Sequence, residues 1–484
     1  MTNLNTTDQE NVQKKLTYQD MPEVQKNKWI IFVSVILFTF MATLDGSIVN
    51  IALPTIAKDF DVDTNKIILV VAIYMIIIST FLIFFGKLGD IFGKIKIFRI
   101  GTLVFVVGSI LSGFATSIEQ LIICRSFQAI GASMTMATNL GIIAEIFSSH
   151  DRAKALGFIG SAVSLGSITG PSVGGLIVEH LSWSYIFWLN APFGIITIFL
   201  GTKYLPKDIT KIKADIDFIG FIIYSFFMIS FFTALFLGQE IGFKNKIILI
   251  LFIFSLVSLI VFIKIELSKK MPLLNISIFK NKSITIGLIC AFFVFCSNSA
   301  FFILMPFYLQ SARGLNPGNA GFFMMIFPLV MVIASPLAGI FVNRIGAHKL
   351  ASLGLFILAF AHSAILLTNM STSLTLFGLI FAILGFGNAL FQPPNNTIIM
   401  GASSKEELGV VGSLNAFSRN IGGTIGIAIS TTILFAAMSY KYGSHVTSYI
   451  EGREDVFMFG MHVVFAFTAF ALISNFILSL YRKS

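Results

Sequence analysis

The chain has 484 residues, of which 56% are hydrophobic and 12% are charged, and its mean hydropathy is +0.89. Soluble domains carry about 25% charged residues, so this composition excludes a soluble globule and indicates a protein embedded in lipid. The formal net charge of +10 would indicate nucleic-acid binding in a soluble protein. Here membrane topology accounts better for the cations, and we expect no nucleic-acid partner.

The amino-terminal region is polar and mixed in charge through residue 28. It lacks the short apolar segment and small-residue cleavage site of a signal peptide. We therefore expect residues 1–28 to form a short disordered cytoplasmic tail, followed by an uncleaved first membrane helix.

Apolar runs recur along the rest of the chain. A helix needs roughly 20 apolar residues to cross about 30 Å of hydrocarbon, and by this measure the sequence predicts an all-α integral membrane protein with fourteen transmembrane helices. The predicted spans are Trp29–Leu53, Ile67–Phe85, Ile95–Ala115, Leu121–Ile146, Ala155–Val178, Trp183–Tyr204, Ile216–Leu237, Ile247–Ile265, Ile284–Leu309, Ala320–Val342, Leu350–Thr368, Leu374–Met400, Val410–Met438 and Phe457–Tyr481.

The basic residues test this count. If the amino terminus is cytoplasmic, most of the 33 Lys and Arg residues fall in segments on the inner side, as the positive-inside rule requires. One missing or extra span would exchange inner and outer segments and remove this asymmetry in the placement of Lys and Arg. We therefore expect a multi-pass plasma-membrane protein with both termini in the cytoplasm.

Two loops repeat one pattern. "GKLGDIFGKIK" (Gly86–Lys96) follows the second span and "GIFVNRIGAHK" (Gly339–Lys349) follows the tenth, with Gly at positions one and eight and Lys at position eleven. The repeat predicts two pseudo-symmetric six-helix bundles, residues 29–205 and 283–484. Residues 206–282 form a linker with two inserted helices. Repeats related about the membrane normal are a transporter architecture, with the substrate site between the halves.

Several motifs in chain order carry a family resemblance: "LDGSIVNIALP", "GKLGDIFGK", "RSFQAIGA", "GSITGPSVGG" and "WSYIFWLNAPFG", then "GNALFQPPNNT" and "NAFSRNIGGTIG". The sequence resembles the major facilitator superfamily, and more narrowly its fourteen-span drug/proton antiporters. This resemblance implies proton-coupled efflux of amphipathic drugs or other lipophilic toxic compounds by alternating access. The proton motive force would drive export without a cofactor.

Asp45 lies within the first span, where a carboxylate costs about 2.5–3.5 kcal/mol at the membrane centre. At 1.5 Å per residue it stands about 24 Å from Trp29 and about 13 Å from Pro54. Arg125 in the fourth span has a matching depth, so we expect the two to pair and to couple proton uptake to transport. The alternatives are that Asp45 only braces its own helix and that Arg125 only clamps neighbouring helices.

The loop after the second span is a candidate gate. Its small residues permit close backbone approach and its charges can contact the facing half or anionic lipid; a topological role, fixing orientation, is the alternative. The expected gating residues are Gly86, Gly89, Asp90, Gly93 and Lys94. Asn343 in the second copy lacks the charge of Asp90, so a charge-based latch would be one-sided.

The fifth span carries glycines at intervals of four residues and an internal proline. Such a groove lets helices approach closely in lipid, and the resemblance implies an antiporter motif that limits uncoupled leak and favours export over uptake. Plain packing of small residues between helices is the alternative, and it does not exclude the antiporter role. The motif residues are Gly166, Gly170, Pro171, Gly174 and Gly175.

Polar residues within other spans are candidates for the substrate cavity: Gln128, Asn388, Gln392, Asn395 and Arg419. Arg419 is either structural or attracts anionic groups, and the lone His362 is expected to serve packing. Asp45 is the one convincing carboxylate within the spans, so we expect neutral, zwitterionic or singly charged amphipathic substrates in place of dications.

The sequence has no nucleotide-binding loop, catalytic cluster or metal-ligand spacing, and we expect neither an enzyme nor a metalloprotein. The chain is expected to function as a monomer. A dedicated exporter of one metabolite, lipid or siderophore is the alternative, and a non-transporting membrane sensor is a further one.

Overall fold

The computed structural model describes residues 17–483 except 148, 210–216, 270–275 and 404–407. These residues form helices joined by short turns and contain no strand. The long helices are α1 Pro22–Asp59, α2 Thr64–Phe92, α3 Lys94–Gly113, α4 Ile118–Ile146, α5 Ser149–His180, α7 Asn190–Tyr204, α8 Phe218–Ile241, α9 Lys246–Ser268, α10 Lys282–Phe307, α11 Pro317–Ile345, α12 Ala347–Ile365, α13 Leu374–Gly401, α14 Leu408–Tyr442 and α15 Glu454–Leu480. The shorter pieces are η1 Tyr18–Asp20, α6 Ser184–Trp188, η2 Ile276–Lys280, η3 Tyr308–Ala312 and η4 Tyr481–Lys483.

The chain is a multi-pass membrane protein. Within the described residues, 12 helices are long and apolar enough to cross a bilayer, with α6 and α7 counted together as Ser184–Tyr204. Helices α4 and α5 are not among these 12. The helix that matches the sixth predicted span is interrupted at Leu189, between α6 and α7.

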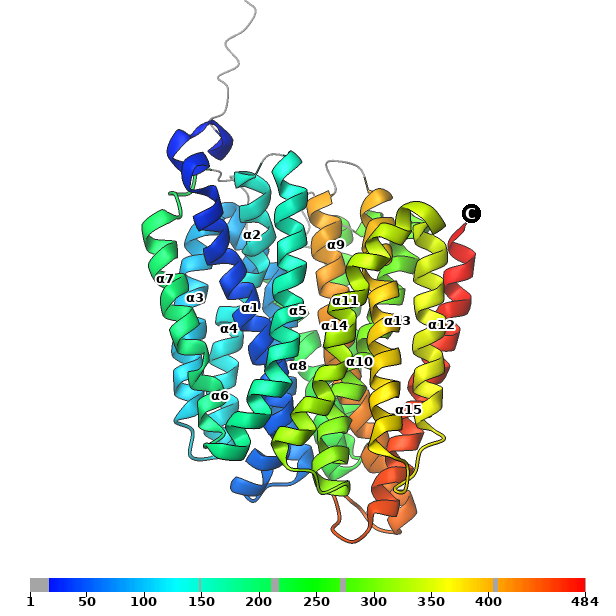
Figure 1. Cartoon of the computed structure of the whole chain (residues 1–484). Helices are drawn as coiled ribbons and strands as arrows, with labels where there is room; N and C mark the ends of the chain where they lie inside the picture. Colours follow the sequence, from blue (N-terminus) through cyan, green and yellow to red (C-terminus); the bar gives the residue numbers. More distant parts are fainter. Residues whose placement is uncertain (1–16, 148, 210–216, 270–275, 404–407, 484) are drawn as a thin grey trace, which may run out of the picture.

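The helices stand side by side in two groups (Figure 1). In the first, α1 packs against α5 and α7, and α4 packs against α2 and α3; in the second, α13 packs against α11 and α12, and α14 against α10 and α15. The two groups meet where α5 contacts α11 and where α2 contacts α14. Helix α1 begins at the same end of the bundle at which the carboxyl terminus lies (Figure 1), and we call this the terminal end.

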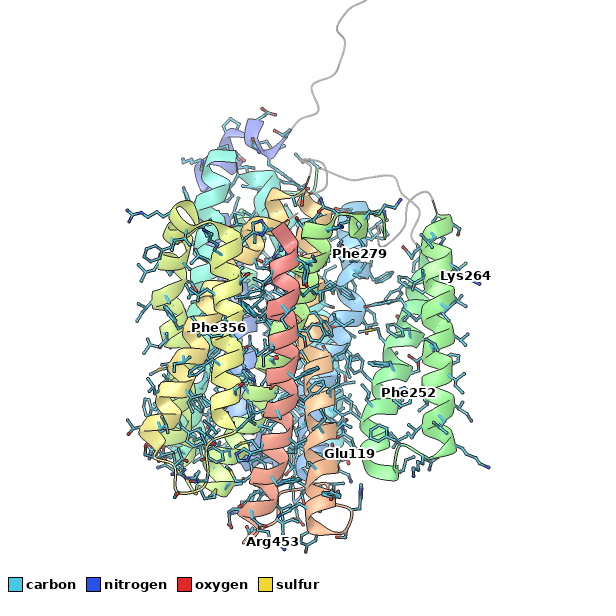
Figure 2. All side chains as sticks on the ribbon, turned by 90° about the vertical axis from the view of Figure 1, so that its right-hand side faces the viewer. Glu119, Phe252, Lys264, Phe279, Phe356 and Arg453 are labelled. Atoms are coloured by element: carbon cyan, nitrogen blue, oxygen red, sulfur yellow. The ribbon has the colours of Figure 1, made fainter. Side chains whose placement is uncertain are left out.

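The two helices between the groups form a pair at the edge of the bundle. Figure 2 shows Phe252 and Lys264 on α9, the outermost helix in that view. Helix α8 packs against α9 and also contacts α2 and α14. From α8, the Tyr224 hydroxyl donates to the Ser79 carbonyl oxygen at 3.2 Å, and Gln239 Nε2 donates to Thr432 Oγ1 at 2.7 Å. The pair therefore touches both groups along their shared seam.

The segment before the first span is ordered from residue 17. Tyr18 is buried, and its hydroxyl donates to the Lys207 carbonyl oxygen at 3.2 Å. Gln25 Nε2 donates to the Ile146 carbonyl oxygen, at the end of α4, at 3.0 Å. The prediction of a disordered tail is therefore wrong for residues 17–28, because these polar side chains cap other elements. Residues 1–16 lie outside the described part of the chain.

Helix α5 is packed tightly on two sides through its glycines. A Cβ atom at Gly170 would lie 2.7 Å from Ser47 Cβ and 2.9 Å from the Ile48 nitrogen, both in α1. A Cβ atom at Gly175 would lie 2.5 Å from the Pro317 carbonyl oxygen in α11. The glycines therefore let α5 approach α1 and α11 at once, which joins the two groups.

We predict that Gly170→Ala destabilises the protein, because an added methyl group has no room between α5 and α1 and overpacking costs about 1–3 kcal/mol. Gly46→Ala is the matched control, since a Cβ atom at Gly46 would meet nothing within 4 Å. The measurement is the apparent melting temperature of the purified protein in detergent. Equal melting temperatures for the two variants would contradict this packing.

Candidate functional site: a buried ion pair

Asp45 and Arg125 are in contact inside the first group of helices. Arg125 Nη1 lies 2.7 Å from Asp45 Oδ2, and the two side chains are 1% and 0% exposed. Asp45 belongs to α1 and Arg125 to α4, and both residues lie well away from the helix ends. The matching depths in the sequence thus correspond to a direct ion pair, sealed from solvent.

Two amide side chains complete the shell of Asp45. Gln128 Nε2 donates to Asp45 Oδ1 at 3.0 Å, and Asn190 Nδ2 donates to the same oxygen at 2.8 Å. Gln128 Oε1 in turn accepts from Arg125 Nη1 at 2.6 Å. Ionised carboxylates accept hydrogen bonds of this kind and are stabilised by them and by a neighbouring cation. The geometry is therefore that of a charged Asp45.

Ser109 and Tyr74 close the cluster. Ser109 Oγ accepts from Asn190 Nδ2 at 2.9 Å and donates to the Phe187 carbonyl oxygen at 2.9 Å. The Tyr74 ring centroid lies 4.1 Å from Arg125 Cζ, within range of a cation–π interaction. The cluster thus draws on α1, α2, α3, α4 and α7, and every member is buried.

Three members were missed in the sequence: Asn190, Ser109 and Tyr74. Asn190 stands in "WSYIFWLNAPFG", which was noted for its resemblance alone, so its position inside a motif was an available signal. Ser109 and Tyr74 gave no such signal, because a single hydroxyl in a span is common and satisfies itself with its own backbone. Gln128, which we assigned to the substrate cavity, instead belongs to this cluster.

The candidate gating loop holds an ion-pair network at the terminal end. Lys94 Nζ lies 2.8 Å from Asp90 Oδ1 and 2.7 Å from Glu145 Oε1. Both acids belong to the same helix group as Lys94, so the described contacts of Asp90 do not include the facing group. Lys94 is directed at these acids and packs along Gly141 of α4, so its described contacts are neither of those expected for the loop charges, with the facing half or with anionic lipid.

The repeated glycine at position eight turns the chain in both copies. Gly93 has φ +110° and Gly346 has φ +94°, values that side-chain-bearing residues rarely adopt. Asp208 caps the helix that follows Gly93, accepting from the Ile95 and Lys96 nitrogens at 2.9 Å each. The sequence repeat therefore marks one backbone turn used twice. The side chain of Asn343 lies outside the described residues. The other two glycines of the loop differ in how closely they are packed. A Cβ atom at Gly86 would meet nothing within 4 Å, whereas a Cβ atom at Gly89 would lie 2.9 Å from Thr138 Cγ2.

The glycine motif of α5, predicted to be an antiporter motif, lies directly beside the Asp45 segment. A Cβ atom at Gly166 would lie 3.0 Å from the Leu44 nitrogen, and Ser47 Oγ donates to the Gly166 carbonyl oxygen at 3.1 Å. Gly174 faces Ile48 and Ile51 in the same way. On the other side of α5, the Pro171 carbonyl oxygen is in contact with Gly321 of α11. The motif therefore connects the α1 segment that carries Asp45 to the second helix group.

The remaining cavity candidates are in the second group. Asn388 is buried and exchanges two hydrogen bonds with Asn298 at 2.9 and 3.1 Å, while Gln392 is half-buried and 3.4 Å from Asn388. Asn395 is used elsewhere: it donates to the Gly287 carbonyl oxygen and accepts from Arg482 Nη1 at 2.7 Å. The side chain of Asn395 is therefore committed to structure.

His362 is buried, and its Nδ1 lies 2.8 Å from Thr468 Oγ1. Its ring is also 5.4 Å from that of Phe465. These contacts fit the packing role expected for a lone histidine in a span.

The family-model comparison decides the identity of the fold. The model described as Major Facilitator Superfamily matches residues 35–427 and, in an overlapping second match, residues 288–483. The chain belongs to this superfamily. Its members are membrane transporters of small substrates, and neither the family nor the fold indicates an enzyme.

Two curated relatives of this superfamily member cover most of its length. The riboflavin transporter RibZ of Clostridioides difficile (strain 630) is 33% identical over 446 residues, which span 91% of this chain and 96% of the relative. The multidrug transporter protein MdtP of Bacillus subtilis (strain 168) is 30% identical over 87% of this chain and 77% of the relative. The relatives therefore include both a transporter of a named metabolite and a multidrug transporter.

Among solved structures, a POT family transporter in complex with 5-aminolevulinic acid aligns with a TM-score of 0.72. The alignment covers 97% of this chain and 100% of that structure, at 14% sequence identity. At this identity the likeness shows the fold alone.

We predict that the Asp45–Arg125 pair behaves as one energetic unit. Arg125→Gln leaves a buried carboxylate without its cation, and breaking a buried pair in this way costs about 3–5 kcal/mol. The double variant Asp45→Asn, Arg125→Gln removes both charges and should be less destabilised than the sum of the single changes. Apparent melting temperatures of the four proteins measure this, and strict additivity would contradict the pairing.

Proposed function

We propose that this protein is a proton-coupled antiporter that exports amphipathic compounds across the plasma membrane by alternating access. In this proposal α4 and α5 also cross the bilayer, which makes fourteen crossings with both termini in the cytoplasm. Two six-helix bundles, residues 29–205 and 283–484, move against each other around the substrate. The protein acts as a monomer and uses the proton motive force without a cofactor.

The observation that carries the proposal is the sealed carboxylate. Asp45 is 0% exposed within a membrane-spanning helix and is held by a guanidinium and two amides. Acidic residues that lie within the membrane and pair with another polar or charged group are typical of proton pathways.

Protonation of Asp45 changes the forces on several helices at once. The neutral acid no longer attracts Arg125, which then keeps Gln128 and the Tyr74 ring as partners. Helix α1 is thereby released from α4, while its Ser47 face remains packed on α5. Because α5 also contacts α11, movement of α1 is transmitted to the second helix group.

The hydrogen bonds between the groups support a state closed on the outer side. Among the described residues, these bonds lie at mid-depth or at the end opposite the termini. Ser79 Oγ is 3.2 Å from Thr424 Oγ1 at mid-depth. Near the opposite end, Gln310 donates to the Ile51 carbonyl oxygen at 2.8 Å and Thr447 to Asp63 at 2.9 Å. With the termini cytoplasmic, the outer ends of the bundles are joined.

The driving force is adequate for export. Each proton that enters gains about 2.3 kcal/mol per 100 mV of membrane potential. At 1.4 kcal/mol per tenfold change, one proton sustains roughly a 40-fold gradient of a neutral solute.

A second candidate is transport of one dedicated metabolite on the same scaffold. The 33% identity to a curated riboflavin transporter over nearly the whole of both chains favours it. The two candidates share the proton mechanism and differ in substrate breadth. Competition among chemically unrelated compounds for transport distinguishes them.

We predict that Asp45→Asn abolishes proton-linked transport. In everted membrane vesicles with an imposed proton gradient and a pH-sensitive dye, a transported compound should dissipate the gradient in the parent protein and not in the variant. The amide keeps the size of the side chain and cannot carry a proton.

Glu119→Gln is the matched control, because Glu119 is an exposed carboxylate at the end opposite the termini (Figure 2). This variant should respond like the parent protein. Normal gradient dissipation by Asp45→Asn would refute the role assigned to Asp45.

A further inference from the structure

Arg419 is placed deep within α14, at about 17 Å from the first residue of that helix by the rise of 1.5 Å per residue. One turn before it on the same face, Asn415 donates to Asn396 of α13 at 2.8 Å. One turn after it, a Cβ atom at Gly423 would lie 3.4 Å from Ser299 Oγ of α10. The face of α14 that carries Arg419 is therefore directed at α10 and α13, and α13 also carries Asn388 and Gln392.

The Arg419 guanidinium has no counter-ion among the described residues. Its Cζ atom lies 5.8 Å from the ring centroid of Phe295, on α10, and its side chain remains partly exposed. Two other arginines, both buried, have partners of their own. Arg125 is paired with Asp45, and Arg482 donates a hydrogen bond to Asn395. A deep cation that lacks a counter-ion in the described part of the chain is positioned to meet an anionic ligand.

Arg419 determines the net charge of the described interior. Within the described helices, only Asp45, Arg125 and Arg419 are charged residues more than six positions from both helix ends. Asp45 and Arg125 neutralise each other at 2.7 Å. The middle of the described helices therefore has one unbalanced positive charge, and in a low-dielectric setting this charge attracts anions and repels cations.

We propose that Arg419 is the charge-recognition residue of the substrate site and that the protein selects organic anions over organic cations of similar size. This inference rests on the proposed export function and names its substrate class. Phe295 offers an aromatic surface beside the guanidinium, and the half-buried Gln392 offers an amide on the same interior side. An amphipathic anion with a planar ring system matches this combination.

Equilibrium binding to the full-length protein in nanodiscs of zwitterionic lipid tests the proposal. The probes are fluorescein, an anion at neutral pH, and rhodamine 123, a cation with the same xanthene core. Fluorescence anisotropy should give at least tenfold tighter binding of fluorescein. Arg419→Gln should lower fluorescein affinity at least tenfold, Arg419→Lys should lower it less, and the exposed control Arg453→Gln should leave it unchanged.

Three results would overturn the proposal: equal or tighter binding of rhodamine 123, an unchanged preference in Arg419→Gln, or no saturable binding of fluorescein. The comparison of dyes on the parent protein holds even if a variant fails to fold. The binding assay has no proton gradient, so its result does not depend on proton coupling. A failure of proton coupling in vesicles is thereby separated from a failure of anion recognition.

An anionic lipid headgroup is chemically able to occupy the same guanidinium. Nanodiscs with one third phosphatidylglycerol address this. Fluorescein affinity within about threefold of the value in zwitterionic lipid supports a soluble substrate. A larger loss would identify the headgroup as the ligand and overturn the assignment.

Discussion

Burial of an ion pair at depth is the constraint around which the first helix group is organised. A carboxylate and a guanidinium removed from water are stable only if their geometry is close and their remaining hydrogen-bonding atoms are satisfied. Asp45 meets this condition with three donors from two other helices, Arg125 and Gln128 of α4 and Asn190 of α7. Helices α1, α4 and α7 must therefore hold their relative positions as long as the carboxylate is charged.

The glycines of α5 extend this constraint across the molecule. The segment of α1 that presents Asp45 to Arg125 presents Ser47 and Ile48 to Gly170 of α5 on its other face. Helix α5 in turn lies against α11 with no side chain between them at Gly175. Tightly packed contacts of this kind do not deform continuously, so a change at Asp45 is transmitted as a movement of whole helices.

The sequence predicted features that depend on depth and composition, and it did not predict those that depend on helix rotation. Asp45 and Arg125 were paired because counting residues from the span ends gives their depth. The turn glycines Gly93 and Gly346 were marked by the repeat. By contrast, the shell residue Asn190 and the commitment of Asn395 to Arg482 depend on which way each helix faces, and weak amphipathicity in lipid-facing helices conceals this. The order of residues 17–28 was missed because its stabilising contacts are to distant carbonyl groups.

The central claim is that Asp45 changes its protonation state during transport while Arg125 loses its partner. Infrared difference spectroscopy on the protein in lipid measures this directly, because a protonated carboxylic acid has a carbonyl band that a carboxylate lacks. On acidification we expect the parent protein to show one such band that Asp45→Asn lacks, whereas the bands of the other carboxyl groups appear in both proteins. A carboxylate at Asp45 that stays ionised over the whole pH range in which transport proceeds would contradict the account.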